Sequence, residues 1–273
     1  MGRYTLDPAM PVLLRPDGVV QVGWDPRRAV LVRTPAELTP AALAELLRTL
    51  QSGATLADLQ ARFEVDAGEL VASLIDAGVV TAAAHRRTRC ASIRIHGRGP
   101  LSDLLAGALR CSGARVTRSS VTQAPPPHTT DLVVLSDFLV TDPRVVRDLH
   151  AAEVAHLPVR LRDGAGLVGP LVIPGVTSCL DCADLHRSDR DAAWPAVASQ
   201  LRNAVGSADR ATVLATAALA LNQIDRVISA VRAGAAVGTS TEPPPTLDTT
   251  VEFDVNAGAI MARRWTRHPK CWC

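Results

Sequence analysis

The chain has 273 residues, of which 47% are hydrophobic and 21% are charged. This composition is typical of a globular protein with a buried core, and the length allows one or two domains. The formal net charge of +2 provides no strong attraction to nucleic acid or to an anionic membrane, so neither is an expected partner.

Two features bear on the location of the protein. No basic start followed by an apolar segment opens the chain, so we expect no signal peptide. The most apolar stretch, residues 211–230, is interrupted by Asn222, Gln223, Asp225 and Arg226. This favours a buried or amphipathic helix over a membrane span. We therefore expect a cytoplasmic protein.

Residues 1–84 are predicted to form a small α+β domain. Two short apolar runs, 19–24 and 29–33, flank a turn with Asp25 and Pro26, a pattern that predicts a β-hairpin. Residues 79–81 resemble a wing strand that returns to this hairpin. Three helices are expected between them, each after a capping residue. They are 41–51 after Thr39, 57–63 after Thr55 and 67–77 after Asp66. This order is typical of a winged helix-turn-helix domain.

The third helix of this domain indicates what it binds. Residues 67–77, with the preceding Asp66, carry Glu69 and Asp76 and no Lys or Arg. A DNA-recognition helix needs basic side chains, so peptide binding is favoured, with the peptide added as a strand against the hairpin. The expected groove residues are Val20, Val22, Val30, Val32, Leu70, Leu74 and Ile75.

A short basic linker, residues 84–89, precedes a second domain, residues 90–273, with an α/β pattern. Strands and helices alternate there at a spacing that predicts a doubly wound parallel sheet. The strands are expected at 91–96, 113–117, 129–136 and 157–162, and the helices at 101–112 and 145–154. A long helix capped by Asp209, over 209–232, and a terminal hairpin, 246–255 with 259–265, are predicted downstream.

The turn after the first of these strands resembles a nucleotide-binding turn that has lost its function. Gly97 and Gly99 occupy the first two glycine positions, but Ser102 stands at the third, and Pro100 removes one backbone donor. Residues 118–120, after the second strand, offer no carboxylate for a ribose. We therefore expect no ATP or NAD to bind there.

Six cysteines in a reducing compartment favour metal binding over disulfides. Cys90 and Cys111 lack close partners and are expected to be small buried core residues. The other four form a CxxC pair and a CxC pair, which together can close a structural zinc site without an open position. They are Cys179, Cys182, Cys271 and Cys273. His186 and His268 are alternative ligands, but four thiolates already complete the site.

Two segments together resemble a known family. The first runs from Gly169-Pro through Pro174-Gly175 and Ser-Cys179-Leu-x-Cys182 to His186-Arg187, and the second is the terminal His268-Pro-x-Cys-x-Cys. The members of this family are ThiF/ubiquitin-activating-like proteins, the cyclodehydratase C proteins of thiazole/oxazole-modified microcin biosynthesis. The resemblance implies a RiPP recognition element that binds a precursor leader peptide, a Rossmann-like ThiF-type sheet domain that serves as scaffold, and a separate YcaO enzyme. It also implies homodimerisation.

The sequence assigns no catalytic residue, because it contains no GxSxG, HExxH or Walker motif. Asp131, Asp137, Arg160 and Arg162 lie near strand ends and could be remnants of the residues with which an adenylating relative holds ATP and magnesium, but solvent exposure or structural pairing is the favoured role for each. The leading hypothesis is a non-catalytic recognition scaffold. An ATP-dependent adenylating enzyme is the alternative, and a zinc-containing DNA-binding regulator is a third.

Overall fold

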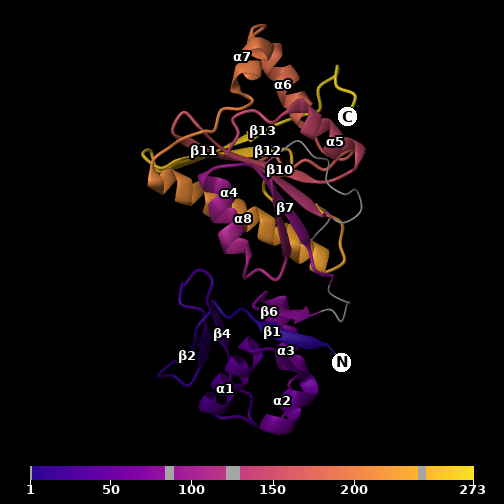
Figure 1. Cartoon of the computed structure of the whole chain (residues 1–273). Coiled ribbons are helices and arrows are strands. Elements are labelled where there is room, and N and C mark those ends of the chain that lie inside the picture. The colour runs from indigo at the N-terminus through magenta and orange to yellow at the C-terminus, as the bar shows by residue number, and fades with distance from the viewer. Residues whose placement is uncertain (1, 84–88, 121–129, 239–243) are drawn as a thin grey trace. The chain divides into compact units, whose positions relative to one another are not determined.

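The computed structural model describes residues 2–83, 89–120, 130–238 and 244–273. Residue 84 and most of the basic linker lie outside these ranges. The chain forms two compact units, residues 1–86 and 87–273. Figure 1 shows small sheets and helices in the first unit and one large sheet with helices in the second.

The first unit contains two three-stranded antiparallel sheets. The predicted hairpin is confirmed as β3 paired with β4, but β2 extends it, and the predicted wing strand is β6, which pairs with an unpredicted strand, β1. The sheet orders are β2-β3-β4 and β5-β1-β6. The strands are β1 (Arg3–Leu6), β2 (Val12–Leu14), β3 (Val20–Val22), β4 (Val30–Val32), β5 (Ala54–Thr55) and β6 (Val80–Ala83). The returning strand therefore joins a different sheet from the hairpin.

All three predicted helices of the first unit are present: α1 (Pro40–Gln51), α2 (Leu56–Phe63) and α3 (Gly68–Asp76). The Thr39 and Thr55 hydroxyls accept hydrogen bonds from the amides of Ala42 and Asp58, as expected of N-caps. The third cap differs from the prediction. Ala67 occupies the N-cap of α3, and the Asp66 carboxylate accepts from the Gly68 amide instead.

The second unit is built on a seven-stranded sheet in the order β13-β12-β11-β10-β9-β7-β8. The four predicted parallel strands form one side and the centre of it, and three antiparallel strands complete it. The parallel strands are β7 (Ser92–His96), β8 (Arg115–Ser119), β9 (Leu132–Ser136) and β10 (His156–Arg162). The antiparallel ones are β11 (Ala165–Val168), β12 (Thr249–Asp254) and β13 (Ala259–Arg264). The predicted terminal hairpin is β12 with β13.

Helices cover both faces of this sheet, which makes the unit Rossmann-like. On one face, α4 (Pro100–Leu109) and α8 (Arg210–Arg232) pack against Leu132 and Val134 of β9. On the other, α5 (Pro143–Ala151) and α6 (Leu180–Ser188) pack against Val133 and Leu135. The side chains of β9 thus alternate between two buried cores. No helix within the described residues has the length and hydrophobicity to cross a membrane.

Candidate functional site

Four cysteine side chains meet at the start of α6. The Sγ atoms are 3.7 Å apart for Cys179 and Cys182, 3.5 Å for Cys179 and Cys271, and 3.4 Å for Cys182 and Cys273. All four sulfur atoms lie within 4.8 Å of one another. Thiolates bound tetrahedrally to zinc at about 2.3 Å lie roughly 3.8 Å from each other. The arrangement therefore fits one tetrahedral metal ion.

The electrostatics of the cluster also favour a cation. Burial raises the pKa of the Cys179 thiol, and the sulfur atoms of Cys271 and Cys182 raise it further. Burial, together with the hydrogen bond to Cys182, raises the pKa of Cys273 to about 11. Deprotonation of these buried thiols therefore requires a nearby cation, and thiolate ligands prefer zinc to magnesium or calcium.

Backbone and histidine contacts hold the two cysteine pairs in place. The amides of Cys182 and His268 donate to Cys179 Sγ and Cys182 Sγ, at 3.4 Å and 3.3 Å. The His268 ring is used outside the cluster, since its Nε2 lies 2.8 Å from Asp189 and its Nδ1 accepts from the Lys270 amide. His186 lies 3.0 Å from the Thr266 carbonyl. Both histidines therefore position the terminal segment instead of joining the cysteine group.

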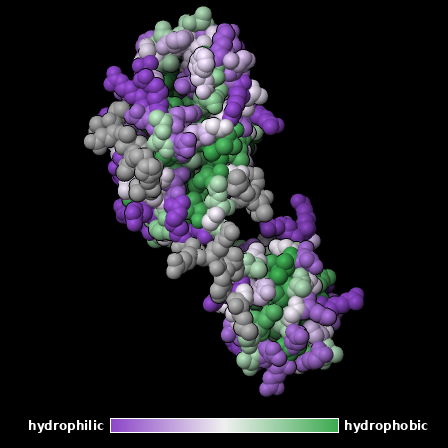
Figure 2. Space-filling view, turned by 90° about the vertical axis from the view of Figure 1, so that its right-hand side faces the viewer, coloured by the Kyte–Doolittle hydropathy of each residue, from purple (hydrophilic) through white to green (hydrophobic). Residues whose placement is uncertain are grey.

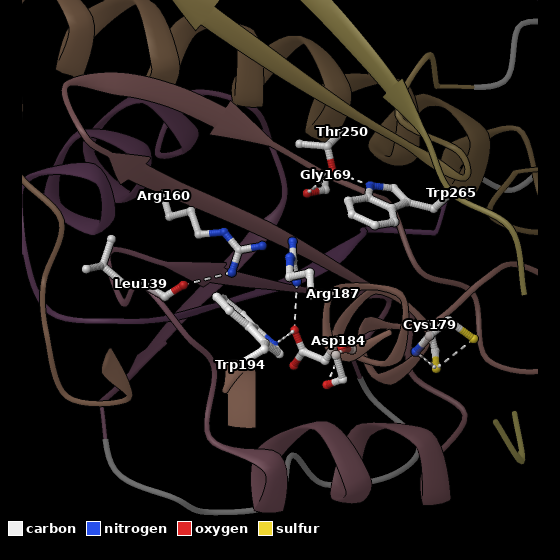
Figure 3. A network of polar contacts seen from close by, with 11 residues as sticks. Leu139, Arg160, Gly169, Cys179, Asp184, Arg187, Trp194, Thr250 and Trp265 are labelled. Carbon is white, nitrogen blue, oxygen red and sulfur yellow. Dashed lines mark hydrogen bonds and ion pairs between the residues drawn. The ribbon is translucent and has the colours of Figure 1, made fainter. Parts of the chain in front are cut away.

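A second set of hydrogen bonds joins the end of the terminal hairpin to the segment that follows β11 (Figure 3). Trp265 Nε1 donates to Thr250 Oγ1 at 2.9 Å, and this hydroxyl donates to the Gly169 carbonyl at 3.1 Å. The Asp248 carboxylate accepts from the amide and the hydroxyl of Ser178, directly before Cys179. The segment that carries the last two cysteines thus leaves the hairpin at a fixed place beside the first two.

The space beside the glycine turn is occupied by a side chain of the same protein, Asp137. Gly97 and Gly99 follow β7 as expected, but a Cβ atom on Gly99 would lie 2.7 Å from Asp137 Oδ1. The Asp137 carboxylate accepts hydrogen bonds from the amides of Leu101 and Ser102, at 2.9 Å and 3.2 Å. These amides at the start of α4 are the donors that a bound phosphate would use. A buried carboxylate, 1% exposed, already occupies that position.

The crevice beside this turn is small. The pocket lined by His96, Ser136, Phe138 and Arg202 has a volume of about 70 Å³. Sites for drug-sized ligands and cofactors usually measure about 300–1,000 Å³. The pocket at the carboxyl ends of β7 and β9 is smaller than this range.

The remaining charged residues near strand ends all have partners within the chain, but Arg160 alone has no carboxylate among them. Asp131 forms an ion pair with Arg89 and accepts from the Ser92 amide. Arg162 forms an ion pair with Glu252 at 2.8 Å. Arg160 donates to the Leu139 carbonyl at 2.9 Å and lies in a large cavity of the second unit.

Six of the seven expected peptide-groove residues belong to one apolar cluster of the first unit, and four of these six are buried. Val20, Val22, Val32 and Leu74 are core residues, and Val30 and Leu70 pack against them while partly buried. Ile75 is exposed. The four core residues have no free apolar surface for a ligand, so a peptide would contact their neighbours.

Exposed apolar side chains lie next to these positions. The register of β2, β3 and β4 places Leu13, Gln21 and Leu31 in one row on the outward face of the sheet, where Leu31 is 56% exposed. Trp24 follows β3 and is also exposed. Figure 2 shows further hydrophobic side chains at the surface of the first unit. Period-two alternation in β4 identifies Leu31, because it points away from the face of Val30 and Val32.

One expectation about the cysteines is wrong. Cys90 and Cys111 are exposed, and neither belongs to the four-cysteine group. Cys90 precedes β7, and Cys111 follows the last turn of α4. Both lie at the ends of elements, where side chains face solvent more often than in the interior.

Comparison with known proteins extends the fold description. No family model and no curated protein sequence matches the chain. Among solved structures, a heterocyclase in complex with substrate and cofactor matches with a TM-score of 0.69 and 17% identity, over 100% of this chain and 39% of that one. The heterocyclase TruD matches at 0.67 and 16%, over 100% and 42%. E. coli MccB with ATP matches at 0.60 and 12%, over 99% of both chains.

These likenesses show a shared fold across both units. The chain spans about 39% and 42% of the length of the two heterocyclases and nearly all of MccB. At these identities the shared fold does not by itself transfer an activity.

Proposed function

We propose that this chain is the recognition scaffold of a RiPP-modifying cyclodehydratase system. In this proposal the first unit is a winged-helix RiPP recognition element that binds a precursor leader peptide in extended conformation. The second unit is a ThiF-like scaffold without catalytic residues. A separate YcaO-type enzyme performs the chemistry on the bound precursor.

The observation that carries the scaffold role is the carboxylate of Asp137 at the start of α4. The fold is shared with a protein whose structure contains ATP, and in such folds phosphates bind at helix N-termini after the first strand. Here a phosphate would need to displace a buried, doubly hydrogen-bonded carboxylate beside a pocket of about 70 Å³. This supports recognition without nucleotide chemistry.

Peptide recognition is supported by the edge of the β2-β3-β4 sheet. Within the described residues β4 pairs with β3 alone, so its other edge offers backbone donors and acceptors to an added strand. Leu31 is exposed on the outward face of this strand and would provide apolar contact, and the exposed Ile75 of α3 is a further candidate contact. Solved structures of MccB with the peptide MccA share the fold.

In this proposal the four cysteines bind a structural zinc. The ion would join the terminal segment to α6 and leave no coordination position for substrate, since four protein ligands complete a tetrahedral shell. The zinc would stabilise the scaffold and take no part in the reaction.

An ATP-dependent adenylating enzyme is the alternative, favoured by the likeness to MccB over 99% of both chains. An ATP–pyrophosphate exchange assay with the full chain, magnesium and candidate peptides separates the two hypotheses. The scaffold hypothesis predicts no exchange above the protein-free background. Exchange that depends on the peptide would favour the adenylating enzyme.

Peptide binding is tested by fluorescence anisotropy. Labelled peptides from the leader regions of short, Cys/Ser/Thr-rich reading frames next to the gene are titrated with the full chain. We expect micromolar binding by one of them, weakened about tenfold or more by Leu31→Asp. Leu14→Asp is the matched control, because Leu14 is 52% exposed on the opposite edge strand of the same sheet. Equal effects of both variants would contradict docking at β4.

A further inference from the structure

A cavity of about 500 Å³ lies in the second unit, at the carboxyl end of β10. It is lined by β10 and β11, the connection between β9 and α5, the helices α5 and α6, and α7 (Trp194–Leu201). Aliphatic side chains from the connection and from α7 form much of the wall, together with the ring of Trp194. Its volume is in the range of small-molecule binding sites.

Arg160 provides an unpaired positive charge in this cavity. Two neighbouring arginines have carboxylate partners, since Arg187 pairs with Asp184 at 2.7 Å and Arg162 with Glu252 at 2.8 Å. For Arg160 the described part of the chain provides only the carbonyl oxygen of Leu139. In Figure 3 its guanidinium lies beside that of Arg187, with the ring of Trp194 next to both.

The surroundings make this charge unfavourable without an anion. Burial lowers the pKa of Arg160 to about 10, repulsion by Arg187 adds to the shift, and attraction by the Asp184 carboxylate offsets part of it. The group is still protonated at neutral pH. A desolvated cation without a counter-charge costs free energy, and the cost is relieved when an anion forms charge-assisted hydrogen bonds with it.

The other charges of the lining select the type of anion. The Asp184 carboxylate is taken by Arg187 and by Trp194 Nε1, at 2.7 Å and 3.1 Å. The carboxylates of Asp163, Asp181 and Asp191 also line the cavity and are exposed. They would repel a polyphosphate with several negative charges. Arg190 also lines the cavity but is exposed to solvent, so a single negative charge matches Arg160, the more buried guanidinium without a carboxylate partner.

We propose that this cavity binds a monocarboxylate with an apolar body, and that the carboxylate is held by Arg160. The aliphatic walls and the Trp194 ring would cover the apolar body. The carboxyl terminus of a peptide and a free N-acylated amino acid share this chemistry. The inference concerns the second unit and does not depend on peptide docking at β4.

The test uses the four tryptophans of the full chain. Their indole N–H signals are recorded by NMR on 15N-labelled protein, and a Trp194→Phe sample assigns the signal of interest. Five ligands are titrated in separate experiments. They are N-acetyl-leucine, its neutral amide, an acetylated tripeptide ending in leucine, inorganic phosphate and ATP. We expect a saturable shift of the Trp194 signal with the two carboxylates and none with the amide. The affinities of N-acetyl-leucine and of the tripeptide are then compared, and the tighter of the two shows whether the cavity prefers a free N-acylated amino acid or the carboxyl terminus of a peptide.

Variants identify the charge and the cavity. Arg160→Gln should weaken N-acetyl-leucine binding about tenfold or more, and Arg160→Lys should restore part of it. Arg118→Gln, an exposed arginine paired with Asp103 outside the cavity, is the matched control and should bind as the unchanged protein does. Val197→Trp fills the cavity from its exposed wall and should abolish binding with Arg160 intact.

Three results would overturn the proposal. The first is an equal response to the acid and its amide. The second is unchanged binding in Val197→Trp, which also covers the case in which Arg160→Gln does not fold. The third is tighter binding of ATP or phosphate than of the carboxylates at the Trp194 signal, which would assign the cavity to phosphorylated ligands.

Discussion

Asp137 combines two requirements in one residue. Its carboxylate accepts from the first amides of α4, and its backbone has φ +72°, a left-handed conformation that Asp and Asn tolerate better than Ala. We expect Asp137→Ala to lower the free energy of unfolding by about 2–3 kcal/mol, because two amides lose their acceptor and the backbone is strained. Urea denaturation measures this loss.

Two variants separate these contributions. Asp137→Asn keeps one acceptor oxygen and tolerates the backbone, so it should cost about 1 kcal/mol. Asp142→Ala removes the N-cap of α5, whose carboxylate accepts from the Arg144 amide, and should also cost about 1 kcal/mol. If Asp137→Ala lowers the free energy of unfolding by no more than Asp142→Ala does, Asp137 contributes only what a usual N-cap residue contributes.

His156 makes the stability of the second unit depend on pH. The ring is fully buried in β10, its Nδ1–H donates to the Val154 carbonyl at 3.0 Å, and its Nε2 has no partner within the described residues. Protonation of Nε2 would bury a donor without an acceptor. Burial accordingly lowers the pKa of His156 from 6.5 to about 4.

The direction of the effect follows from proton binding. Between pH 6.5 and about 4 the unfolded state binds a proton at His156 and the folded state does not, so stability falls as the pH falls through this window. The total contribution is about 3 kcal/mol. Denaturation curves at several pH values should show a smaller pH slope for His156→Gln. An identical slope would assign the pH dependence to other groups.

At the level of elements, the zinc hypothesis predicts about one metal ion per chain. Changing Cys271 and Cys273 to Ser should remove it, as measured by inductively coupled plasma mass spectrometry. The terminal segment should then become open to carboxypeptidase, since His268 and the two cysteines connect it to α6. The matched control changes the exposed Cys90 and Cys111 to Ser, which should leave the metal in place. Full metal retention in the first variant would contradict the pairing of the two motifs.

Elements with local signals were predictable, and elements with distant partners were not. Thr39, Thr55 and Asp209 cap helices through amides three residues away, so the sequence pattern identifies them. The helix α6 was missed, because its N-cap is Cys179, whose Sγ accepts from the Cys182 amide where an oxygen is usual. The strand β1 was missed, because its partner β6 lies more than seventy residues away.

The candidate sites divide in the same way. The four cysteines were predictable, because two close pairs of one ligand type have few other structural uses. The role of Asp137 depends on amides about 35 residues away, and the cavity around Arg160 joins side chains from β10, β11, α5, α6 and α7. No local pattern encodes either, since each arises only when the sheet brings strand ends and helices together.

At the level of the whole molecule, the scaffold hypothesis predicts a kinetic effect on a reaction that the chain does not itself perform. A YcaO enzyme and precursor peptide encoded near the gene are combined with ATP, with and without the chain, and loss of water from the peptide is followed by mass spectrometry. We expect the chain to increase the rate most at low precursor concentration, because it raises the local concentration of the peptide at the enzyme.

The variants locate this effect in the molecule. Leu31→Asp should raise the apparent KM for the precursor about tenfold and leave kcat nearly unchanged, because it weakens ground-state binding remote from the chemistry. Leu14→Asp should behave as the unchanged chain. A Leu31→Asp variant that lowers kcat at saturating precursor would instead indicate that the first unit takes part in the reaction itself. Equal rates with and without the chain would contradict the scaffold role.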